Sequence, residues 1–502
     1  MYSYNSPELE LETDMPRSGS RRDWFQTVGQ GLHAAALTWL LGRDLFNCPT
    51  AIAAAEPDND TPRRRFDLKP RQPHFEPRAK SVIHLFMNGG PSQMDLFDPK
   101  PELDKRHGES YFEKIAGEVE NPGAAGALMR SPFTFAQHGE SGTWVSDAMP
   151  QLATCVDDIA VLRSMYTVNL THEPALFIIH GGGMIPGLPS MGAWVTYGLG
   201  SENQNLPAYV VLDDPKGLPI NRTQNWQSGF LPPLYQGTRF RSTGSPVLNL
   251  SREFDEPEPV TQVERQLLAG LDRIHRTKRH GQPNLDARIA SYELAARMQL
   301  AASNALDIKD EGQATLEMYG IGKEPTDSYG RRCLYARRLV ERGVRFVQLF
   351  IDAQIWDNHT GLKGGLKSAC DRTDMPVAGL LKDLKQRGLL DDTLVVWGGE
   401  FGRLPIAQLP GDKNVDKAGR DHNKNAMVSW MAGGGIKGGV SHGETDPFGF
   451  AATEKRVGVP DFHATILHQL GLHHEQLYYS RNGLKERLTG VQPARVISEI
   501  LA

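Results

Sequence analysis

The stretch TLVVWGGEFGR, residues 393–403, joins an apolar run to a glycine-rich end. Its β-branched and aromatic residues predict a strand that is buried on both faces, as strands of parallel sheets are. The preceding residues 375–388 place apolar side chains at positions i, i+3, i+4 and i+7, which predicts an amphipathic helix. In α/β folds built from such units, ligands bind beyond the carboxyl ends of the strands. Glu400 stands at such an end, although a turn carboxylate paired with Arg403 explains it equally well.

Similar patterns along the chain predict the rest of an α/β domain. Apolar runs predict strands at 81–87, 159–165, 208–212, 344–351 and 428–432, and helical periodicity predicts helices at 263–274, 286–306, 328–342 and 461–471. We therefore expect a mostly parallel central sheet that is flanked by helices on both faces. The expected domains are an export leader at 1–55, a linker at 56–79 and one α/β domain at 80–502, with insertions near 99–145 and 200–260 and a helical segment at 259–342.

The N-terminal segment has the pattern of an export leader. Arg21 and Arg22 precede an apolar run at 31–41, and the three alanines at 53–55 form a small-residue cleavage pattern before Glu56. This order predicts a twin-arginine signal and a periplasmic or extracellular mature protein. An amphipathic N-terminal helix with incidental arginines is the alternative. The apolar run is too short and interrupted to span a bilayer, so we expect no transmembrane helix in the mature protein.

The overall composition is that of an ordinary globular protein, with 39% hydrophobic residues and a formal net charge of −5. This charge gives no reason to expect a nucleic-acid partner. The sixteen histidines are enough to form metal sites, whereas the four cysteines do not have the spacing of a zinc site.

Residues that can bind a metal ion follow several predicted strands. Asp357 and His359 come after the strand at 344–351, and their spacing lets both reach one ion. The candidate metal ligands are Asp95, Asp357, His359, Glu400 and His422. Carboxylates and neutral imidazoles bind Zn, Mn or Fe, and Ca is a further candidate for the divalent cofactor. Polar turns explain Asp95 and the Asp357–His359 pair as well, and Asn88 lies nearer than Asp95 to the end of the first strand.

Residues 169–182 predict a helix that begins at Thr171. Threonine is a good N-cap, and Pro174 suits the first helical turn. The N-terminus of a helix presents backbone N–H groups and favours anions such as phosphate or sulfate. His172, beside the cap, is a candidate ligand for metal or substrate, and an ordinary cap followed by a loop histidine is the alternative.

Several longer segments carry a resemblance. Residues 377–402 are similar to the helix–strand–metal segment of sulfatases and the alkaline phosphatase superfamily. The segments HLFMNGGPSQMDLFDPKPEL, GGEFGR, GRDHN and DFHATILHQLGL together resemble a bacterial family of unknown function with a sulfatase-like core, domain-of-unknown-function family fifteen-oh-one. The resemblance covers the chain from about residue 80 onward, and no activity comes with that family.

The resemblance implies roles for single residues. Superfamily members place their nucleophile at a helix start, which corresponds to Thr171, and their last metal-binding histidine corresponds to His422. They carry an Asp-His pair where this chain has Glu400 and Phe401, so one ligand of a second metal site is missing here. Formylglycine sulfatases need Cys-x-Pro-x-Arg, and none of the four cysteines has this pattern. A sulfatase-like fold is therefore expected, but not a formylglycine sulfatase.

These features predict an exported, metal-dependent hydrolase of phosphate or sulfate esters, acting on a small-molecule or carbohydrate ester. The metal would polarise the ester, and Arg403 or Arg420 would hold the anion. Two alternatives remain. One is a catalytically inactive metal-binding relative with a carbohydrate- or partner-binding role, and the other is an enzyme of different chemistry on the same scaffold.

Export provides the first test. Replacing Arg21 and Arg22 together by lysine should trap the precursor inside the cell, because the paired arginines are what the export pathway reads. Fractionation followed by N-terminal sequencing would measure this, with mature wild-type protein beginning near Glu56. Normal export of the double variant would remove the leader prediction.

Overall fold

The computed structural model describes residues 66–241, 247, 257–279 and 282–502. The leader expected at 1–55 and the start of the expected linker lie outside the described residues. No helix in the described part is long and apolar enough to cross a membrane.

One large sheet forms the centre of the domain, and its strands largely match the predicted ones. Its nine strands include β1 at its middle, flanked by β9 and β8. Across the sheet the order is β14 (Val440–His442), β5 (Ile159–Tyr166), β13 (Met427–Ala432), β9 (Thr393–Gly398), β1 (Ser81–Phe86), β8 (Phe346–Phe350), β6 (Tyr209–Leu212) and β7 (Thr238–Phe240), with β17 (Val457–Gly458) also paired to β5.

The sheet is mostly parallel, as predicted, and β13 is the exception. β13 runs antiparallel to both of its neighbours, β5 and β9, whereas the other pairs in this sheet are parallel. Residues that precede β13 therefore lie at the same sheet edge as residues that follow β5, β9, β1 and β8. This edge collects side chains from loops that are far apart in the sequence.

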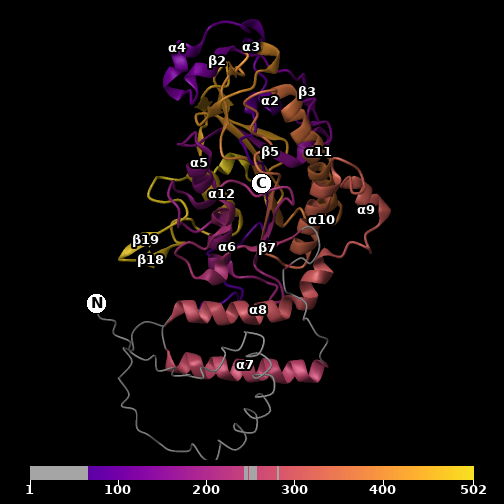
Figure 1. Cartoon of the computed structure of the whole chain (residues 1–502), viewed down its shortest axis with the longest axis vertical. Helices are drawn as coiled ribbons and strands as arrows, with labels where there is room; N and C mark the ends of the chain where they lie inside the picture. Colours follow the sequence, from indigo (N-terminus) through magenta and orange to yellow (C-terminus); the bar gives the residue numbers. More distant parts are fainter. Residues whose placement is uncertain (1–65, 242–246, 248–256, 280–281) are drawn as a thin grey trace, which may run out of the picture. The chain divides into compact units, whose positions relative to one another are not determined.

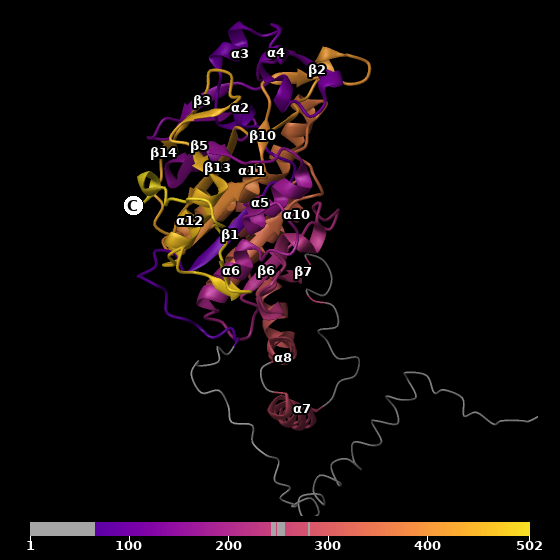
Figure 2. The ribbon, with the colours of Figure 1, turned by 90° about the vertical axis from the view of Figure 1, so that its left-hand side faces the viewer.

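Helices cover both faces of the sheet (Figures 1 and 2). Side chains of β1 alternate between two apolar cores, with Ile83 and Leu85 in one and Val82 and Phe86 in the other. The first core includes side chains of α8 (Pro283–Leu306), α10 (Asp327–Glu341) and α11 (Leu362–Gln386), and the second includes those of α5 (His172–Gly181), α6 (Met191–Leu199) and α12 (Val459–Gln469). Both faces are buried, which explains why the strands read as continuous apolar runs.

The region expected as an insertion near 99–145 contains short elements of its own. They are α3 (Pro101–Lys105), α4 (Phe112–Ile115), β2 (Ala125–Leu128), β3 (Phe135–His138) and β4 (Thr143–Ser146). β2 pairs with β11 (Ile406–Gln408), which follows β9 in the chain, so this region is tied to the sheet's carboxyl edge. The same edge carries a small ladder in which Arg403 of β10 (Gly402–Arg403) pairs with His422 of β12 (His422–Asn423).

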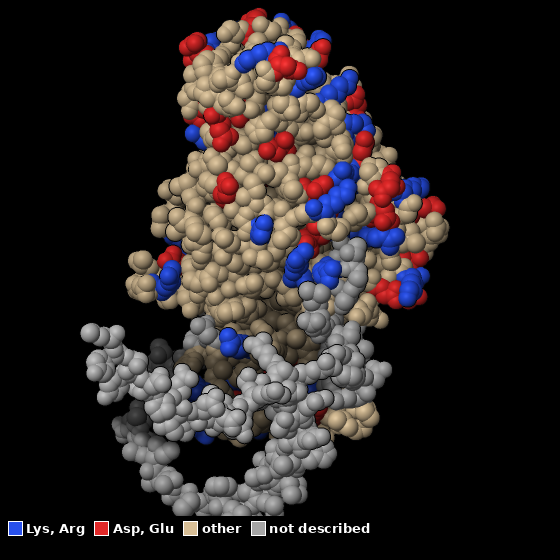
Figure 3. All heavy atoms as spheres, viewed as in Figure 1, with Lys and Arg blue, Asp and Glu red and all other residues tan. Residues whose placement is uncertain are grey.

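Within the segment expected to be helical, the structure has α7 (Glu258–Lys278), followed by α8 and α10. A short helix that the sequence did not predict, α9 (Gln313–Met318), lies between α8 and α10. The remaining α-helix and strands of the described residues are α2 (Gln93–Leu96) and the two-stranded ladders of β15 (Glu444–Thr445) with β16 (Ala452–Glu454) and of β18 (Tyr479–Arg481) with β19 (Leu484–Glu486). On the face shown in Figure 3, acidic and basic side chains are interspersed rather than gathered into a field of one sign.

A buried ionic network joins α10 to α11. Arg337 donates from Nε to Asp383 Oδ2 at 2.9 Å and from Nη2 to Glu311 Oε2 at 2.7 Å. Tyr319 also donates to Asp383, at 2.9 Å. Each buried charge in this network is paired, which is the condition for its retention in a core.

Breaking this network should destabilise the fold. Arg337→Ala should lower the free energy of unfolding by about 3 kcal/mol, the lower end for a broken buried pair, because Arg387 still contacts Asp383. The matched control is Arg331→Ala on the same helix, where the half-exposed pair with Asp327 contributes at most about 1 kcal/mol. Urea denaturation would measure the free energy of unfolding of both variants. Equal losses of stability would contradict the conclusion that the buried network contributes more than the half-exposed pair.

Candidate metal centre

Four side chains meet at the carboxyl edge of the sheet. His172 is the first residue of α5, which follows β5 in the chain. Asp357 and His359 lie in the loop between β8 and α11, and His422 lies on β12, just before the antiparallel strand β13. The sheet topology therefore brings three chain segments to one place.

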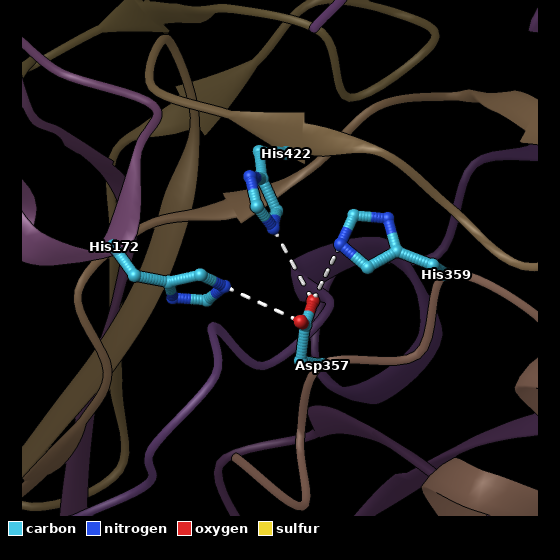
Figure 4. A group of neighbouring side chains, drawn as sticks. All are labelled: His172, Asp357, His359 and His422. Atoms are coloured by element: carbon cyan, nitrogen blue, oxygen red, sulfur yellow. Dashed lines mark hydrogen bonds and ion pairs between the residues drawn. The ribbon is translucent and has the colours of Figure 1, made fainter. Parts of the chain in front are cut away.

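The three imidazoles all direct Nε2 towards the carboxylate of Asp357 (Figure 4). His359 Nε2 lies 2.9 Å from Asp357 Oδ1, and His422 Nε2 lies 3.2 Å from the same oxygen. His172 Nε2 lies 3.3 Å from Asp357 Oδ2. Ligand atoms of these four residues all lie within 4.8 Å of one another, so the group can hold one metal ion.

The other ring nitrogen of each histidine has a side-chain oxygen nearby, which is a hydrogen-bond partner for His172 and His359 and an ion-pair contact for His422. The pairs are His172 Nδ1 with Glu400 Oε1 at 2.7 Å, His359 Nδ1 with Gln408 Oε1 at 2.5 Å, and His422 Nδ1 with Glu120 Oε2 at 2.5 Å. An acceptor at Nδ1 keeps the proton on that nitrogen and leaves the Nε2 lone pair for a ligand bond. Metal-binding histidines in proteins are commonly oriented in this way.

Arg403 positions the central carboxylate. Its Nη2 donates to Asp357 Oδ1 at 2.6 Å, its Nε donates to Gly90 O at 2.9 Å, and its Nη1 donates to Arg420 O at 3.0 Å. The side chain is buried, so these contacts fix both its direction and that of Asp357. The guanidinium thus joins the loop after β1 to the loop after β8.

The electrostatics of the metal-free site favour an ionised Asp357 and raise the pKa of His172 and of His359. Burial opposes ionisation of Asp357, but its contacts with the three histidines and the charge of Arg403 hold its pKa well below the usual range. Burial likewise would lower the pKa of His172, but Asp357 and Glu400 outweigh it and raise that pKa to about 9. A cation between the imidazoles would take the place of these protons.

The donor set fits a transition metal or zinc. Three imidazole nitrogens and one carboxylate suit Zn, Mn or Fe, whereas Ca prefers sites made of oxygen atoms. His172 Nε2 is buried and makes no well-aligned hydrogen bond in the described structure, which leaves its lone pair available for an ion.

Two of the residues predicted as ligands have other partners. Asp95 is fully buried and forms an ion pair with Arg420, whose Nε donates to Asp95 Oδ2 at 2.7 Å. Glu400 contacts His172 and accepts the Gly89 N–H at 3.0 Å, so it stands behind an imidazole. Neither carboxylate belongs to the group of four that can share an ion.

Thr171 is the N-cap residue of α5, the position that the sequence predicted. Its side chain is exposed and makes no hydrogen bond that caps the helix. The Thr171 N–H donates to Asn169 Oδ1 at 2.8 Å, which holds the backbone at the helix start. The hydroxyl therefore stands free beside His172, at the positive end of a helix.

Sequence reasoning did not identify Glu120 or Gln408. Glu120 lies in the region that was expected to be an insertion, and Gln408 lies on β11, beyond the glycine-rich turn. Neither residue has a neighbouring histidine or lies in a motif, so the sequence gives no signal for them. Their position beside the histidines becomes visible only once β2 is paired with β11.

The family described as "Protein of unknown function (DUF1501)" matches residues 79–501. The chain belongs to this family. No curated protein matches the DUF1501 chain.

Solved structures similar to this DUF1501 chain are enzymes with low sequence identity to it. The lipoteichoic acid synthase LtaP from Listeria monocytogenes is 10% identical with a TM-score of 0.35, over 80% of this chain and 74% of that chain. A phosphonate monoester hydrolase from Silicibacter pomeroyi is 10% identical with a TM-score of 0.34, over 84% and 76%. The PsFucS1 sulfatase from Pseudoalteromonas sp. is 12% identical with a TM-score of 0.34, over 80% and 68%. These values transfer no activity to the DUF1501 chain.

Metal affinity should depend on pH through His172. In metal-free protein the raised pKa means that protonated His172 stabilises the fold fully below pH 6.5, and this contribution is lost as pH rises through about 9. An ion must displace that proton, so apparent zinc affinity should increase by about tenfold per pH unit between pH 7 and pH 8.5.

Competition with a chromophoric chelator would measure the affinity, and elemental analysis would count the bound ion. Glu400→Gln keeps the shape of the side chain but removes a charge that raises the pKa of His172, so it should flatten the pH dependence. His359→Ala should lose the ion altogether. A zinc affinity that is equal at pH 7 and pH 8.5 in wild-type protein would contradict this account.

Proposed function

We propose that this protein is a metal-dependent hydrolase of phosphate or sulfate esters. The observation that supports it is the convergence of three imidazole Nε2 atoms on Asp357, each oriented through Nδ1, next to the N-terminus of α5. An ion held there would polarise the ester oxygen and lower the pKa of a bound hydroxyl group. Together with the expected leader, this makes it an exported enzyme that acts on a small-molecule or carbohydrate ester.

The start of α5 is the proposed anion site. The helix is ten residues long, and its first N–H groups point towards the end that carries Thr171 and His172. Such an end favours phosphate or sulfate oxygens. Substrate bound there has its phosphorus or sulfur atom beside the exposed hydroxyl of Thr171.

Thr171 is the proposed nucleophile. Its hydroxyl oxygen forms a bond to the phosphorus or sulfur atom while the bond from that atom to the ester oxygen breaks, and the hydroxyl proton passes to the departing alkoxide, which leaves as the alcohol. Water then hydrolyses the threonine ester and regenerates the side chain. A free threonine hydroxyl is a poor nucleophile, so this step depends on an ion at the neighbouring four-residue centre.

The two arginines that were expected to hold the anion have positioning roles in this proposal. Arg403 and Arg420 are buried, and both direct their donors to protein oxygens. Arg403 orients Asp357, and Arg420 neutralises Asp95. The backbone at the α5 N-terminus remains to bind the anion.

A second candidate function is metal binding without turnover. The ring centroid of Phe401 lies 4.8 Å from that of His172 and 4.4 Å from that of His422. Phe401 occupies the sequence position where the superfamily that this chain resembles has a metal-binding histidine. A phenylalanine ring cannot bind a metal ion, so a second ion would lack one of its ligands. The site would then hold one ion, whereas a two-metal hydrolase holds two. This observation favours slow hydrolysis, or a binding role, over rapid phosphatase activity.

Thr171 separates these possibilities. With zinc- or manganese-loaded protein and p-nitrophenyl phosphate or sulfate, Thr171→Ala should lower turnover by about 10³-fold or more, because the nucleophile is removed. Bound metal should be unchanged, because Thr171 is outside the ligand group. Thr171→Ser, which keeps a hydroxyl, is the matched control and should retain turnover. Undiminished hydrolysis by Thr171→Ala would exclude Thr171 as nucleophile, and stoichiometric metal with no hydrolysis by wild-type protein would favour the binding role.

A further inference from the structure

Three fully buried histidines lie between the sheet and its helices, away from the metal centre. His84 is on β1, His180 is in the last turn of α5, and His463 is on α12. The three side chains are at most 3% exposed. The rings of His84 and His180 are 5.9 Å apart, and both lie against the ring of Phe86. We call these three residues the histidine cluster.

Hydrogen bonds define His180 as a neutral acceptor. Tyr209 donates its hydroxyl to Gln348 Oε1, which turns the amide nitrogen of Gln348 towards His180. Gln348 Nε2 then donates to His180 Nδ1 at 3.2 Å. A proton on His180 Nδ1 would point at this amide N–H donor. Protonation of both ring nitrogens would therefore break the hydrogen bond from Gln348 to His180.

His463 holds α5 from the opposite side. Its Nε2 donates to the carbonyl of Ile179 at 2.8 Å, in the last turn of α5. His463 Nδ1, His180 Nε2 and His84 Nδ1 are buried and have no hydrogen-bond partner among the described atoms. The C-terminal half of α5 is thus held between Gln348 of the sheet and His463 of α12 by groups that suit neutral rings.

No carboxylate offsets a proton in this layer. Among the described groups, the charges that act on His84 are those of His463, and the charges that act on His180 are those of His84 and His463. Tyr209 is the other titratable group that packs there, and burial raises its pKa. Burial lowers the pKa of His84 to about 3 and that of His463 to about 4, and lowers that of His180 well below its usual value.

A cavity of about 10 Å³, the volume that holds roughly one water molecule, lies beside His180 and is also lined by Phe177, Ser190 and Gln224. A water molecule in this cavity would lie next to the histidine cluster.

We propose that the histidine cluster is an acid-sensitive latch that holds α5 in place. Protonation puts like charges into a layer with no counter-ion among the described groups and breaks the contact of Gln348 with His180 on α5. The helix then leaves the sheet. Because the other end of α5 carries Thr171 and His172, acid removes one metal ligand and the helix start from the centre.

The expected magnitude follows from linkage. Each cluster histidine titrates near pH 6.5 when it is released but stays neutral in the folded layer. Between pH 7.5 and pH 5.5, each should therefore raise the equilibrium constant for opening by about tenfold. The fold is most stable above pH 6.5 with respect to these groups, and this stability is lost as pH falls towards 4.

Hydrogen exchange measured by mass spectrometry on the full mature chain would test the latch. Peptides of α5 should lose protection at pH 5.5, after correction for intrinsic rates, while peptides of β9 stay protected. His84→Phe keeps the ring contacts without a titrating group, and His463→Gln keeps a donor for Ile179. Each should reduce the acid-induced opening of α5 by about tenfold.

The control is His138→Gln, on β3 outside the cluster, which should behave as wild type. Zinc retained after dialysis at pH 5.5 gives a second readout without ester hydrolysis: it should be higher in the two cluster variants than in wild type, because protonation of His172 itself is common to all of them. The proposal is overturned if both cluster variants open like wild type, or if α5 and β9 lose protection together, since this would be global acid unfolding.

Discussion

The carboxylate of Asp357 is the group on which the candidate centre depends. It contacts three imidazoles and one guanidinium, which come from four segments of the chain. A carboxylate that is only 18% exposed is costly to ionise unless opposite charge surrounds it. The loops that carry these partners are therefore held to one another through a single side chain. An ion that enters the site would replace the protons of the imidazoles as the compensating charge.

The position of this centre follows from the sheet topology. Parallel strands deliver the ends of β1, β8 and β9 to one edge, and the antiparallel strand β13 brings the residue before it to that edge as well. The region near residues 99–145 supplies Glu120, and β11, which pairs with β2 of that region, supplies Gln408. The ligands come from loops and short segments around the sheet, whereas these two neighbouring groups come from the added region and from the strand that pairs with it.

Helix α5 connects a charged region at its N-terminus to an apolar layer near its C-terminus. At its N-terminus, His172 lies among carboxylates that favour a protonated or metal-bound ring. Near its C-terminus, His180 lies in an apolar layer that favours a neutral ring. Two histidines about two helical turns apart therefore have opposite pKa shifts. Nearby carboxylates raise the pKa of His172, whereas burial without a carboxylate lowers that of His180.

The sequence by itself determined the elements of the α/β domain, its mostly parallel sheet and the grouping of Asp357 with His359, because apolar periodicity and short spacings are local properties. It also predicted Thr171 as a helix cap from residue preference alone. Only the tertiary structure decided that Asp95 pairs with Arg420, that Glu400 stands behind His172, and that His172 belongs to the group with His422. These choices depend on strand order and on which buried charges find partners, and both are set by contacts between residues hundreds of positions apart.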